Sequence, residues 1–507
     1  MTDRWKLPAP LSSSADNCLE SLQDALVRES VSEPAALIDG IQGAPDASEF
    51  MAQLRYVLAC SEFVTKTLNV NPAHLIALVS DGLFRPQTSD DIQALSGRLA
   101  ACVDQRELDR TLRLERNRAM VRIIWRDFTR AASMTETTAE LSALADTMIH
   151  GALNWHYSAL TERFGEPVGQ ESGAVQPLVV LGMGKLGACE LNVSSDIDLI
   201  FSYPEAGETN GEKKTLSNQE FFVRLGQKLI QSLDTNSADG FVFRVDMRLR
   251  PHGQSGALVQ NFDAMESYYQ SQGRDWERYA MIKARPVAWV TGGESACAEL
   301  MQLLAPFTYR QYVDFSVIES LRAMKGLINR QVQRKGMDLD VKLGVGGIRE
   351  IEFVVQLFQL IRGGRDLALR ERQVCKLLPL LEQEKYLPEG SGTGLLEAYV
   401  FLRNTEHGIQ GYQDRQTQSL PTDELDRLRL AVVMGYSDWE SFTAALEGHR
   451  ALVNREFQEV IADPDAEHDV DSESLDAWFS VWEVSDSDQQ ALEVLTEANW
   501  VNAERVL

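Results

Sequence analysis

The most regular hydrophobic pattern lies near the middle of the chain, where two apolar runs flank a glycine-rich turn. The first run, Leu-Val-Val-Leu at 178–181, is followed by Gly-Met-Gly-Lys-Leu-Gly at 182–187. The second is Asp-Ile-Asp-Leu-Ile-Phe at 196–201, which begins with alternating polar and apolar residues. This pattern predicts a strand, a tight turn, a short helix and a second strand. Since residues two apart on a strand share a face, Asp196 and Asp198 should point the same way, with their apolar neighbours in the core.

Two carboxylates on one strand face repel each other unless a cation lies between them. Mg2+ prefers oxygen ligands and commonly keeps substrate phosphates in its coordination shell. The glycine-rich turn would let backbone N–H groups approach an anion at the start of a helix. A metal site beside a phosphate site is therefore the working hypothesis, although an isolated Asp-x-Asp is more often a solvated strand edge. The turn also spells G-x-G-x-x-G, but the second strand follows Gly187 too soon for the crossover helix of a dinucleotide-binding unit.

Most of the remaining chain has the apolar spacing of helices. We expect loosely structured residues over 1–45, helices from 48 to about 164, and helices again from 306 to about 461. Within the first helical part, 112–133 mixes apolar residues with many arginines, which favours a solvated basic face over a surface for an acidic partner. The acidic run at 463–476 contains no Lys or Arg and predicts a solvated linker before a new helical segment.

A second strand with charged residues is expected after the central motif. A capping box at 217–220 should open an amphipathic helix that ends at 239–240. Alternation over 240–251 then predicts a strand with one charged face. That face suits either a structural ladder of ion pairs or a site for metal and phosphate. Its charged residues are Arg244, Asp246, Arg248 and Arg250.

A second glycine-rich loop precedes an amphipathic helix near residue 350. Gly346, Gly347 and Arg349 could form an anion pocket opposite the metal site. The acidic residues Glu350 and Glu352 could equally well complement the dipole at the start of that helix. The sequence favours neither interpretation.

Composition narrows the class of protein. At 507 residues the chain has room for two or three domains. Its 75 acidic residues against 49 basic ones disfavour binding to nucleic acid or to an anionic membrane. No stretch approaches the roughly 18 uninterrupted apolar residues of a membrane span, and the N-terminus lacks the core of a signal peptide. Six scattered cysteines without a Cys-x-x-Cys pair indicate reduced thiols in a cytoplasmic protein and no zinc site.

Several long motifs in a fixed order resemble one family. GMGKLG, ELNVSSDIDLIF (190–201), RVDMRLRP (244–251) and GVGGIREIEFVVQLFQLIRGGR (344–365) are similar to the bacterial glutamine synthetase adenylyltransferase/adenylyl-removing enzymes. The central stretch also looks like the wider nucleotidyltransferase fold of polymerase beta and kanamycin nucleotidyltransferase. Two departures stand out. Ala188 stands where the family has a second glycine, and Lys185 stands where the wider superfamily has a serine that contacts phosphate.

The resemblance implies an α+β, mostly helical fold, with a small mixed-sheet nucleotidyltransferase core between N-terminal and C-terminal helical regions. The family carries two such domains in one chain, and the motifs here follow the first. The resemblance therefore implies the N-terminal, deadenylylating half, without the second nucleotidyltransferase domain. The implied parts are a helical N-terminal region (1–165), a catalytic domain (166–300), a helical bundle domain (301–462), and an acidic linker with the start of a truncated helical region (463–507).

In that family, orthophosphate attacks the AMP group on a glutamine synthetase tyrosine and releases ADP and free tyrosine, which regulates nitrogen assimilation. The alternatives are adenylyl transfer from ATP, which the same carboxylates would serve, and a non-catalytic module that binds nucleotide or a signalling protein. The implied cofactor is Mg2+. The implied partners are glutamine synthetase as protein substrate, a PII-type signal protein, and phosphate with ADP or ATP.

The resemblance also implies roles for individual residues. Asp196, Asp198 and Asp246 would be the catalytic residues and the Mg2+ ligands, with Asp246 as the third carboxylate that two-metal phosphoryl chemistry needs. Nearby arginines would hold phosphate oxygens through paired hydrogen bonds. The expected nucleotide- and phosphate-binding residues are Gly184, Lys185, Ser194, Ser195, Arg248, Arg250, Gly346, Gly347 and Arg349.

Overall fold

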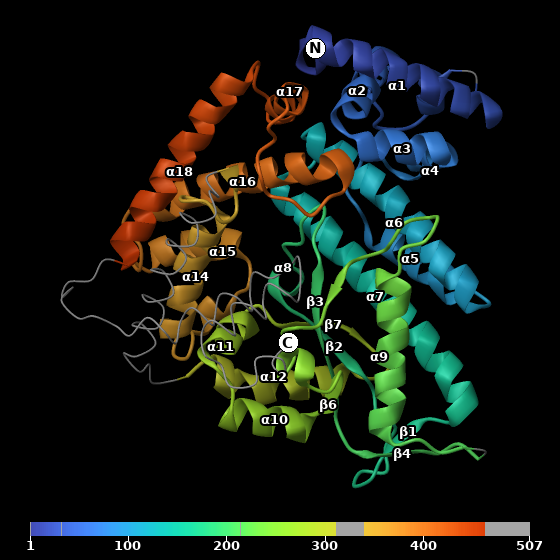
Figure 1. The fold of residues 1–507 in the computed structure, drawn as a ribbon, viewed down its shortest axis with the longest axis vertical. Helices are drawn as coiled ribbons and strands as arrows, with labels where there is room; N and C mark the ends of the chain where they lie inside the picture. Colours follow the sequence, from blue (N-terminus) through green and yellow to red (C-terminus); the bar gives the residue numbers. More distant parts are fainter. Residues whose placement is uncertain (1, 32, 213, 311–338, 462–507) are drawn as a thin grey trace, which may run out of the picture.

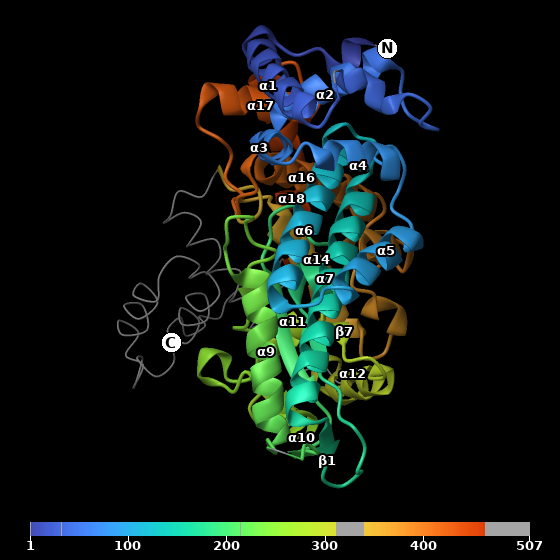
Figure 2. The same ribbon diagram turned by 90° about the vertical axis from the view of Figure 1, so that its right-hand side faces the viewer.

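The computed structural model describes residues 2–31, 33–212, 214–310 and 339–461. Figures 1 and 2 show an elongated molecule in which a small sheet lies between an N-terminal group of helices and a C-terminal helical bundle. The expected α+β, mostly helical fold with a small mixed sheet is confirmed. The acidic linker and helical segment expected from residue 463 onward lie outside the described residues.

The N-terminal region is helical almost from its start. Its helices are α1 (Ala9–Arg28), α2 (Ala47–Cys60), α3 (Glu62–Val70), α4 (Ala73–Asp81), α5 (Ser89–Ala100), α6 (Gln105–Phe128) and α7 (Met134–Phe164). The expectation of loose structure over 1–45 is wrong for 9–28, because α1 buries Leu11, Leu22 and Leu26 and packs on α2 and α3. Its proline lies at the first turn, where a missing N–H costs nothing.

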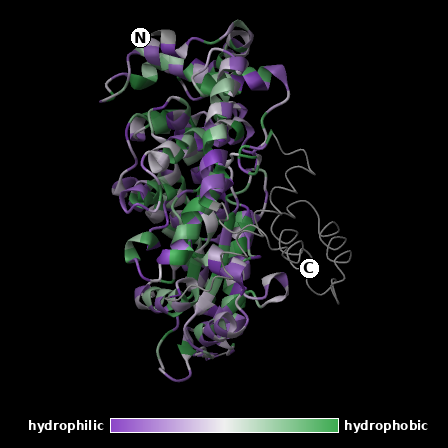
Figure 3. Cartoon of the chain, turned by 90° about the vertical axis from the view of Figure 1, so that its left-hand side faces the viewer, coloured by the Kyte–Doolittle hydropathy of each residue, from purple (hydrophilic) through white to green (hydrophobic). Residues whose placement is uncertain are grey.

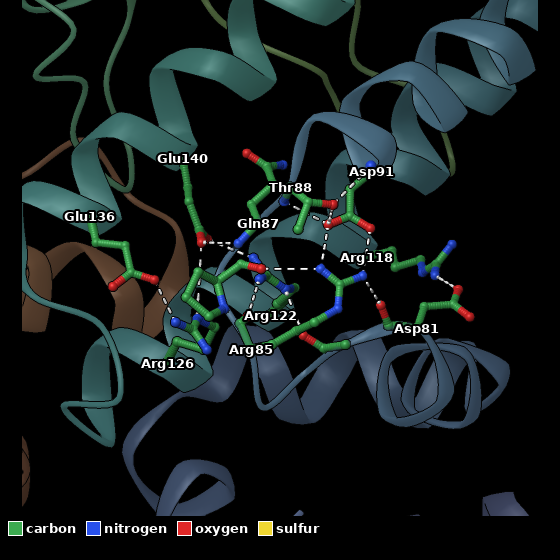
Figure 4. Close-up of polar contacts among 12 residues, drawn as sticks. Asp81, Arg85, Gln87, Thr88, Asp91, Arg118, Arg122, Arg126, Glu136 and Glu140 are labelled. Atoms are coloured by element: carbon green, nitrogen blue, oxygen red, sulfur yellow. Dashed lines mark hydrogen bonds and ion pairs between the residues drawn. The ribbon is translucent and has the colours of Figure 1, made fainter. Parts of the chain in front are cut away.

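The arginines of α6 from residue 112 onward do not form the solvated face that the sequence suggested. Arg116 and Arg126 are 3% and 2% exposed. Figure 4 shows how the acidic residues of the next helix turn toward α6: Arg122 pairs with Glu140 at 2.6 Å, and Arg126 pairs with Glu136 at 2.5 Å. The arginines are inside the protein because carboxylates from neighbouring elements neutralise them there.

The central sheet is mixed and has the strand order β5-β3-β2-β7, with β6 also paired to β3. Strand β3 is antiparallel to β2 and parallel to both β5 and β6, and β2 is antiparallel to β7. A separate pair joins β1 and β4. The strands are β1 (Pro167–Gly169), β2 (Val179–Gly182), β3 (Ile197–Tyr203), β4 (Gly207–Thr209), β5 (Val245–Asp246), β6 (Val259–Asn261) and β7 (Arg285–Trp289).

Helices cover both faces of this sheet (Figure 1). The helices around it are α8 (Gly184–Gly187), α9 (Asn218–Asp234), α10 (Phe262–Ser271), α11 (Asp275–Met281) and α12 (Glu294–Thr308). Val180 and Phe201 belong to the core shared with α7 and α9, whereas Val179 and Ile200 belong to the core shared with α10 and α12. The strand alternation therefore fills two cores, one on each face of the sheet.

Two details of the region after β3 differ from expectation. The capping box between Ser217 and Glu220 is confirmed, but α9 ends at Asp234 rather than at Asp239-Gly240. The strand expected over 240–251 is only the two-residue β5. After β5, the amide of Arg250 donates to the carbonyl of Met247, which closes a turn and removes the chain from the sheet.

The C-terminal bundle has its own hydrophobic core and also contacts the N-terminal helices. Its helices are α14 (Ile348–Arg362), α15 (Val374–Gln383), α16 (Ser391–Gln413), α17 (Glu424–Val433) and α18 (Trp439–Ile461). Helix α17 packs on α1 and α2, and α16 packs on α3, α6 and α7 (Figure 2). On the face drawn in Figure 3, hydrophilic and hydrophobic residues alternate along the helices, as amphipathic packing requires.

The six cysteines are all free thiols. In the described part of the chain, no helix combines the length and apolar content needed to cross a membrane.

Candidate active site

The glycine-rich turn brings backbone directly against one of the predicted catalytic carboxylates. Gly184 opens the short helix α8 with φ +50°, a left-handed conformation that side chains rarely adopt. A Cβ at this position would lie 2.9 Å from Oδ2 of Asp198. The amide of Met183 also donates to the carbonyl of Asp198. Glycine is therefore required here because turn and carboxylate are in contact.

The three predicted catalytic aspartates lie at one end of the sheet. Asp196 directly precedes β3, Asp198 is its second residue, and Asp246 ends β5 in direct register with Asp198. As expected, Ile197 and Leu199 point into the core and are fully buried. Burial and the charges of Asp196 and Asp246 raise the pKa of Asp198 to about 8. The register of Asp198 with Asp246, and the single residue between Asp196 and Asp198, bring the three carboxylates to the same end of the sheet.

The third aspartate is held by an arginine of its own turn. Oδ1 of Asp246 accepts from the amide of Arg248 at 2.7 Å, and Oδ2 accepts from Nε and Nη2 of its guanidinium at 2.8 and 2.5 Å. The hydrogen bond to Asp246 raises the pKa of Arg248. Across the described ranges, no group of three or more His, Cys, Asp or Glu side chains is arranged to hold a metal ion. Asp196 and Asp198 still fit Mg2+, which needs only one or two carboxylates beside phosphate oxygens.

The two predicted serines have different surroundings. Ser194 is 2% exposed, its amide donates to Oε1 of Gln410 at 3.0 Å, and its hydroxyl accepts from Nη2 of Arg244 at 2.7 Å. The hydroxyl of Ser195 donates to Oδ1 of Asp196 at 3.4 Å. Ser194 is therefore bound within the protein, whereas Ser195 lies at the carboxylate site.

Two predicted phosphate-binding cations also have protein partners. Nζ of Lys185 donates to Glu406 on α16 at 3.1 Å, and burial lowers the pKa of this lysine to about 8. The guanidinium of Arg250 donates to the carbonyls of Met247 and Gly256 at 2.7 and 3.3 Å, so it holds the turn after β5 together. Both side chains therefore have partners within the protein.

The second glycine-rich loop packs tightly under the start of α14. Gly346 has φ +71°, and a Cβ there would lie 2.2 Å from the carbonyl oxygen of Arg450. Its amide donates to Oε2 of Glu350 at 3.1 Å, and the amide of Arg349 donates to the carbonyl of Lys342 at 3.1 Å. A Cβ at Gly347 would lie 2.6 Å from that same carbonyl. The amides of Gly346 and Arg349 are thus bonded within the loop, which leaves side chains to provide the anion pocket considered from sequence.

Lys342, a half-buried residue of this loop, was not among the site residues predicted from the sequence. Its amide donates to Oδ1 of Asp340 at 2.8 Å, which fixes its position. The positive charge of Lys342 lowers the pKa of Asp198, which opposes the rise caused by burial and by the acidic neighbours. Within the described residues, its ammonium group makes no ion pair. Only its place beside Gly346-Gly347 could have drawn attention to it in the sequence.

A mixed sheet with an Asp-x-Asp strand beside a glycine-rich turn, and a third aspartate on the adjoining parallel strand, places this protein among the nucleotidyltransferases. Comparison with family models agrees. The model described as glutamate-ammonia ligase adenylyltransferase matches residues 51–299, and the model described as GlnD PII-uridylyltransferase matches residues 322–461.

Curated relatives give the particular family. The chain is 49% identical over 503 residues to the bifunctional glutamine synthetase adenylyltransferase/adenylyl-removing enzyme of Pseudomonas aeruginosa, covering 98% of this chain and 50% of the relative. It is 52% identical over 452 residues to the enzyme of Pseudomonas putida, covering 88% and 46%. The corresponding enzyme of Nitrosococcus oceani is 48% identical over 461 residues, covering 90% and 46%. The chain belongs to this family and spans about half the length of the curated relatives it matches, which confirms the resemblance.

Proposed function

We propose that this chain removes AMP from the tyrosine of adenylylated glutamine synthetase by phosphorolysis. An oxygen of orthophosphate bonds to the phosphorus of AMP, the bond from that phosphorus to the tyrosine oxygen breaks, and the phenolate takes up a proton. The products are ADP and free tyrosine. The relatives' names pair adenylyl transfer with adenylyl removal of glutamine synthetase. The match of 190–201 to the first of the family's two domains favours removal.

The observation that carries this proposal is the gathering of three aspartates beside a glycine turn. Asp196 and Asp198 are the residues that would hold Mg2+. Asp246 would be a third ligand once Arg248 leaves it to bind the substrate. When bound, the ion supplies positive charge against the AMP phosphate and the leaving oxygen. Phosphoryl transfer needs little covalent help from the protein, so positioning and charge are the main contributions.

The cations around the carboxylates are suited to the two phosphate groups. The positive charges of Lys342 and Arg248 both lower the pKa of Asp198, and we assign these two cations to the oxygens of AMP and of the incoming phosphate. Orthophosphate is already largely ionised at neutral pH, and the site therefore needs no strong general base. The basic residues orient the nucleophile, and Gly184 leaves room for the carboxylate of Asp198 because it has no Cβ.

The forward reaction, transfer of AMP from ATP, is the second candidate, because the relatives are named as bifunctional. The same carboxylates would serve both directions, since both pass through transfer of one AMP group. A PII-type signal protein is our proposed regulator and rests on the resemblance. A non-catalytic module would be indicated by loss of a carboxylate, and all three aspartates are present.

The test uses the full chain, adenylylated glutamine synthetase and Mg2+, with and without orthophosphate, and measures ADP. We expect phosphate-dependent ADP that disappears in Asp196→Asn. The matched control is Asp263→Asn, which removes an exposed aspartate from the first turn of α10. If the chain instead transfers AMP from ATP to unadenylylated glutamine synthetase and releases no ADP, it catalyses the forward reaction and not AMP removal. Absence of both activities, even with a PII-type protein, would refute nucleotidyl transfer.

A further inference from the structure

One face of α16 carries polar residues that turn into the protein. Glu406 and Gln410 are 0% exposed, and the side chain of Asp414, directly after the helix, is 6% exposed. Residues four apart lie on the same helix face, so the three form one line, which we call the α16 stripe. Buried polar and charged groups are unfavourable unless each has a partner, so the partners of this stripe are informative.

Glu406 binds the glycine-rich turn. Its two carboxylate oxygens accept from Nζ of Lys185 at 3.1 and 3.4 Å, across 221 residues of sequence. Lys185 directly follows Gly184, whose backbone lies against the carboxylate of Asp198. The position of Glu406 therefore bears on the position of the turn that touches Asp198.

Gln410 binds the segment on the other side of the site. Its Oε1 accepts from the amide of Ser194 at 3.0 Å, and its Nε2 donates to Glu406 at 3.5 Å. Ser194 stands two residues before Asp196, at the entry to β3. Gln410 thus connects Glu406, which binds the glycine-rich turn, to Ser194, which precedes the aspartate strand.

Asp414 supports the same segment less directly. It forms a buried ion pair with Arg116 at 2.7 Å. The guanidinium of Arg116 and that of Arg244 lie over the ring of Phe241 at 5.0 and 4.9 Å from its centre. Arg244 in turn donates to the hydroxyl of Ser194 at 2.7 Å. Ser194 is therefore held from two sides by contacts that originate in α16.

We propose that Glu406 and Gln410 are positioning residues for AMP transfer, through which the C-terminal bundle fixes the glycine turn and the Asp196–Asp198 strand relative to each other. This inference rests on the proposed function, because it assigns these residues to that site. Neither side chain touches the aspartates, so each acts through Lys185 or Ser194. The catalytic site is thereby completed by a helix about 200 residues away in sequence.

A purely structural role makes a different prediction. Loss of a buried contact that only supports the fold should lower stability and leave the kinetics of folded protein unchanged. Loss of a positioning contact should lower kcat while KM for adenylylated glutamine synthetase stays nearly constant, because the ground state binds as before. A displacement of reacting groups by 1 Å can cost about 100-fold in rate.

The main variant is Gln410→Met, which removes the acceptor for the Ser194 amide at similar volume. We expect kcat for phosphate-dependent ADP release to fall by about 100-fold, with KM within about 3-fold. The matched control is Thr405→Val, next to Glu406 on the same helix. Thr405 is 0% exposed and its hydroxyl donates to the carbonyl of Phe401 at 2.9 Å, within α16 itself. It should lose stability only.

Hydrogen exchange gives a readout that does not depend on activity. In Gln410→Met, peptides covering residues 192–198 should exchange faster than in wild type, and Thr405→Val should leave them unchanged. If Gln410→Met does not fold, Glu406→Gln carries the test, because it keeps the shape and removes the charge that pairs with Lys185 and, at 3.6 Å, with Arg403 of the same helix. Combined with Lys185→Met, its effect on kcat should be less than the product of the two single effects.

Unchanged kcat in folded Gln410→Met and Glu406→Gln would overturn the inference, and so would equal exchange of 192–198 in all variants. Activity of the wild type would still support the proposed function. If wild type itself releases no ADP, the proposed function fails. The exchange result for 192–198 then decides separately whether the α16 stripe fixes this segment.

Discussion

Substitution of Gly184 by alanine tests whether the position of Asp198 matters for activity. The added Cβ would lie 2.9 Å from Oδ2 of Asp198, whereas contacts below 3.4 Å are rare for real Cβ atoms. The carboxylate must therefore move by about 0.5 Å, the difference between these two distances. The left-handed backbone at φ +50° adds roughly 1–2 kcal/mol of strain for a residue with a Cβ.

Gly173→Ala separates strain from displacement. Gly173 has φ +65°, and a Cβ there would meet nothing within 4 Å. Both variants should lose similar stability, measured as the midpoint of thermal unfolding. Only Gly184→Ala should lose activity, by about 10- to 100-fold in kcat for phosphate-dependent ADP release.

One result for Gly184→Ala would refute a role for Asp198 in AMP transfer. If Gly184→Ala is as destabilised as Gly173→Ala and yet keeps kcat within about 3-fold of wild type, a shift of the Asp198 carboxylate is harmless. Asp198 would then not hold the reacting groups, and the assignment of this end of the sheet as the active site would be wrong.

Asp198→Asn should abolish AMP transfer and reduce the pH dependence of stability. Since burial and neighbouring carboxylates raise the pKa of Asp198 to about 8, its contribution to wild-type stability is present below about pH 4 and lost as the pH rises through about 8. In Asp198→Asn, the unfolding midpoint, measured in EDTA, should therefore fall less than in wild type between low and high pH. A pH dependence equal to that of wild type would contradict the raised pKa of Asp198. Arg116→Ala leaves Asp414 buried without its partner and should cost about 3–5 kcal/mol in urea unfolding. Arg98 is 44% exposed in its pair with Glu115, so Arg98→Ala should cost under about 1 kcal/mol. Equal effects would show that burial is not decisive. Lys342→Gln should weaken phosphate binding, seen as a KM for orthophosphate raised about 10-fold at constant stability, and an unchanged KM would place Lys342 outside the phosphate site.

Much of the site could be predicted because its signals are local. The alternation at Asp196 and Asp198 places both side chains opposite the buried Ile197 and Leu199, as the structure confirms. The glycine at 184 follows from a turn that no side chain could adopt without strain. Both features depend on backbone geometry over a few residues, which sequence patterns report well.

Two expectations about secondary structure failed, one over 240–251 and one near the N-terminus. The strand expected over 240–251 breaks after Asp246, where a turn closed by Arg250 takes over. The N-terminal residues looked loose because prolines and serines are common there, but burial of leucines on α1 decides their helical state. In α1, tertiary packing outweighs local preference, whereas after Asp246 a local turn ends the strand.

By itself, the sequence determined the type of chemistry: an Asp-x-Asp strand beside a glycine turn, a third aspartate downstream and helices on both sides. Only the tertiary structure decided what each charged residue binds. Lys185, expected at phosphate, pairs with Glu406 across 221 residues, and Arg116 of α6, expected on a solvated face, pairs with Asp414 after α16. The physical reason is that side-chain direction is set locally by the backbone, whereas the electrostatic partner of a buried charge is set by whichever element packs against it.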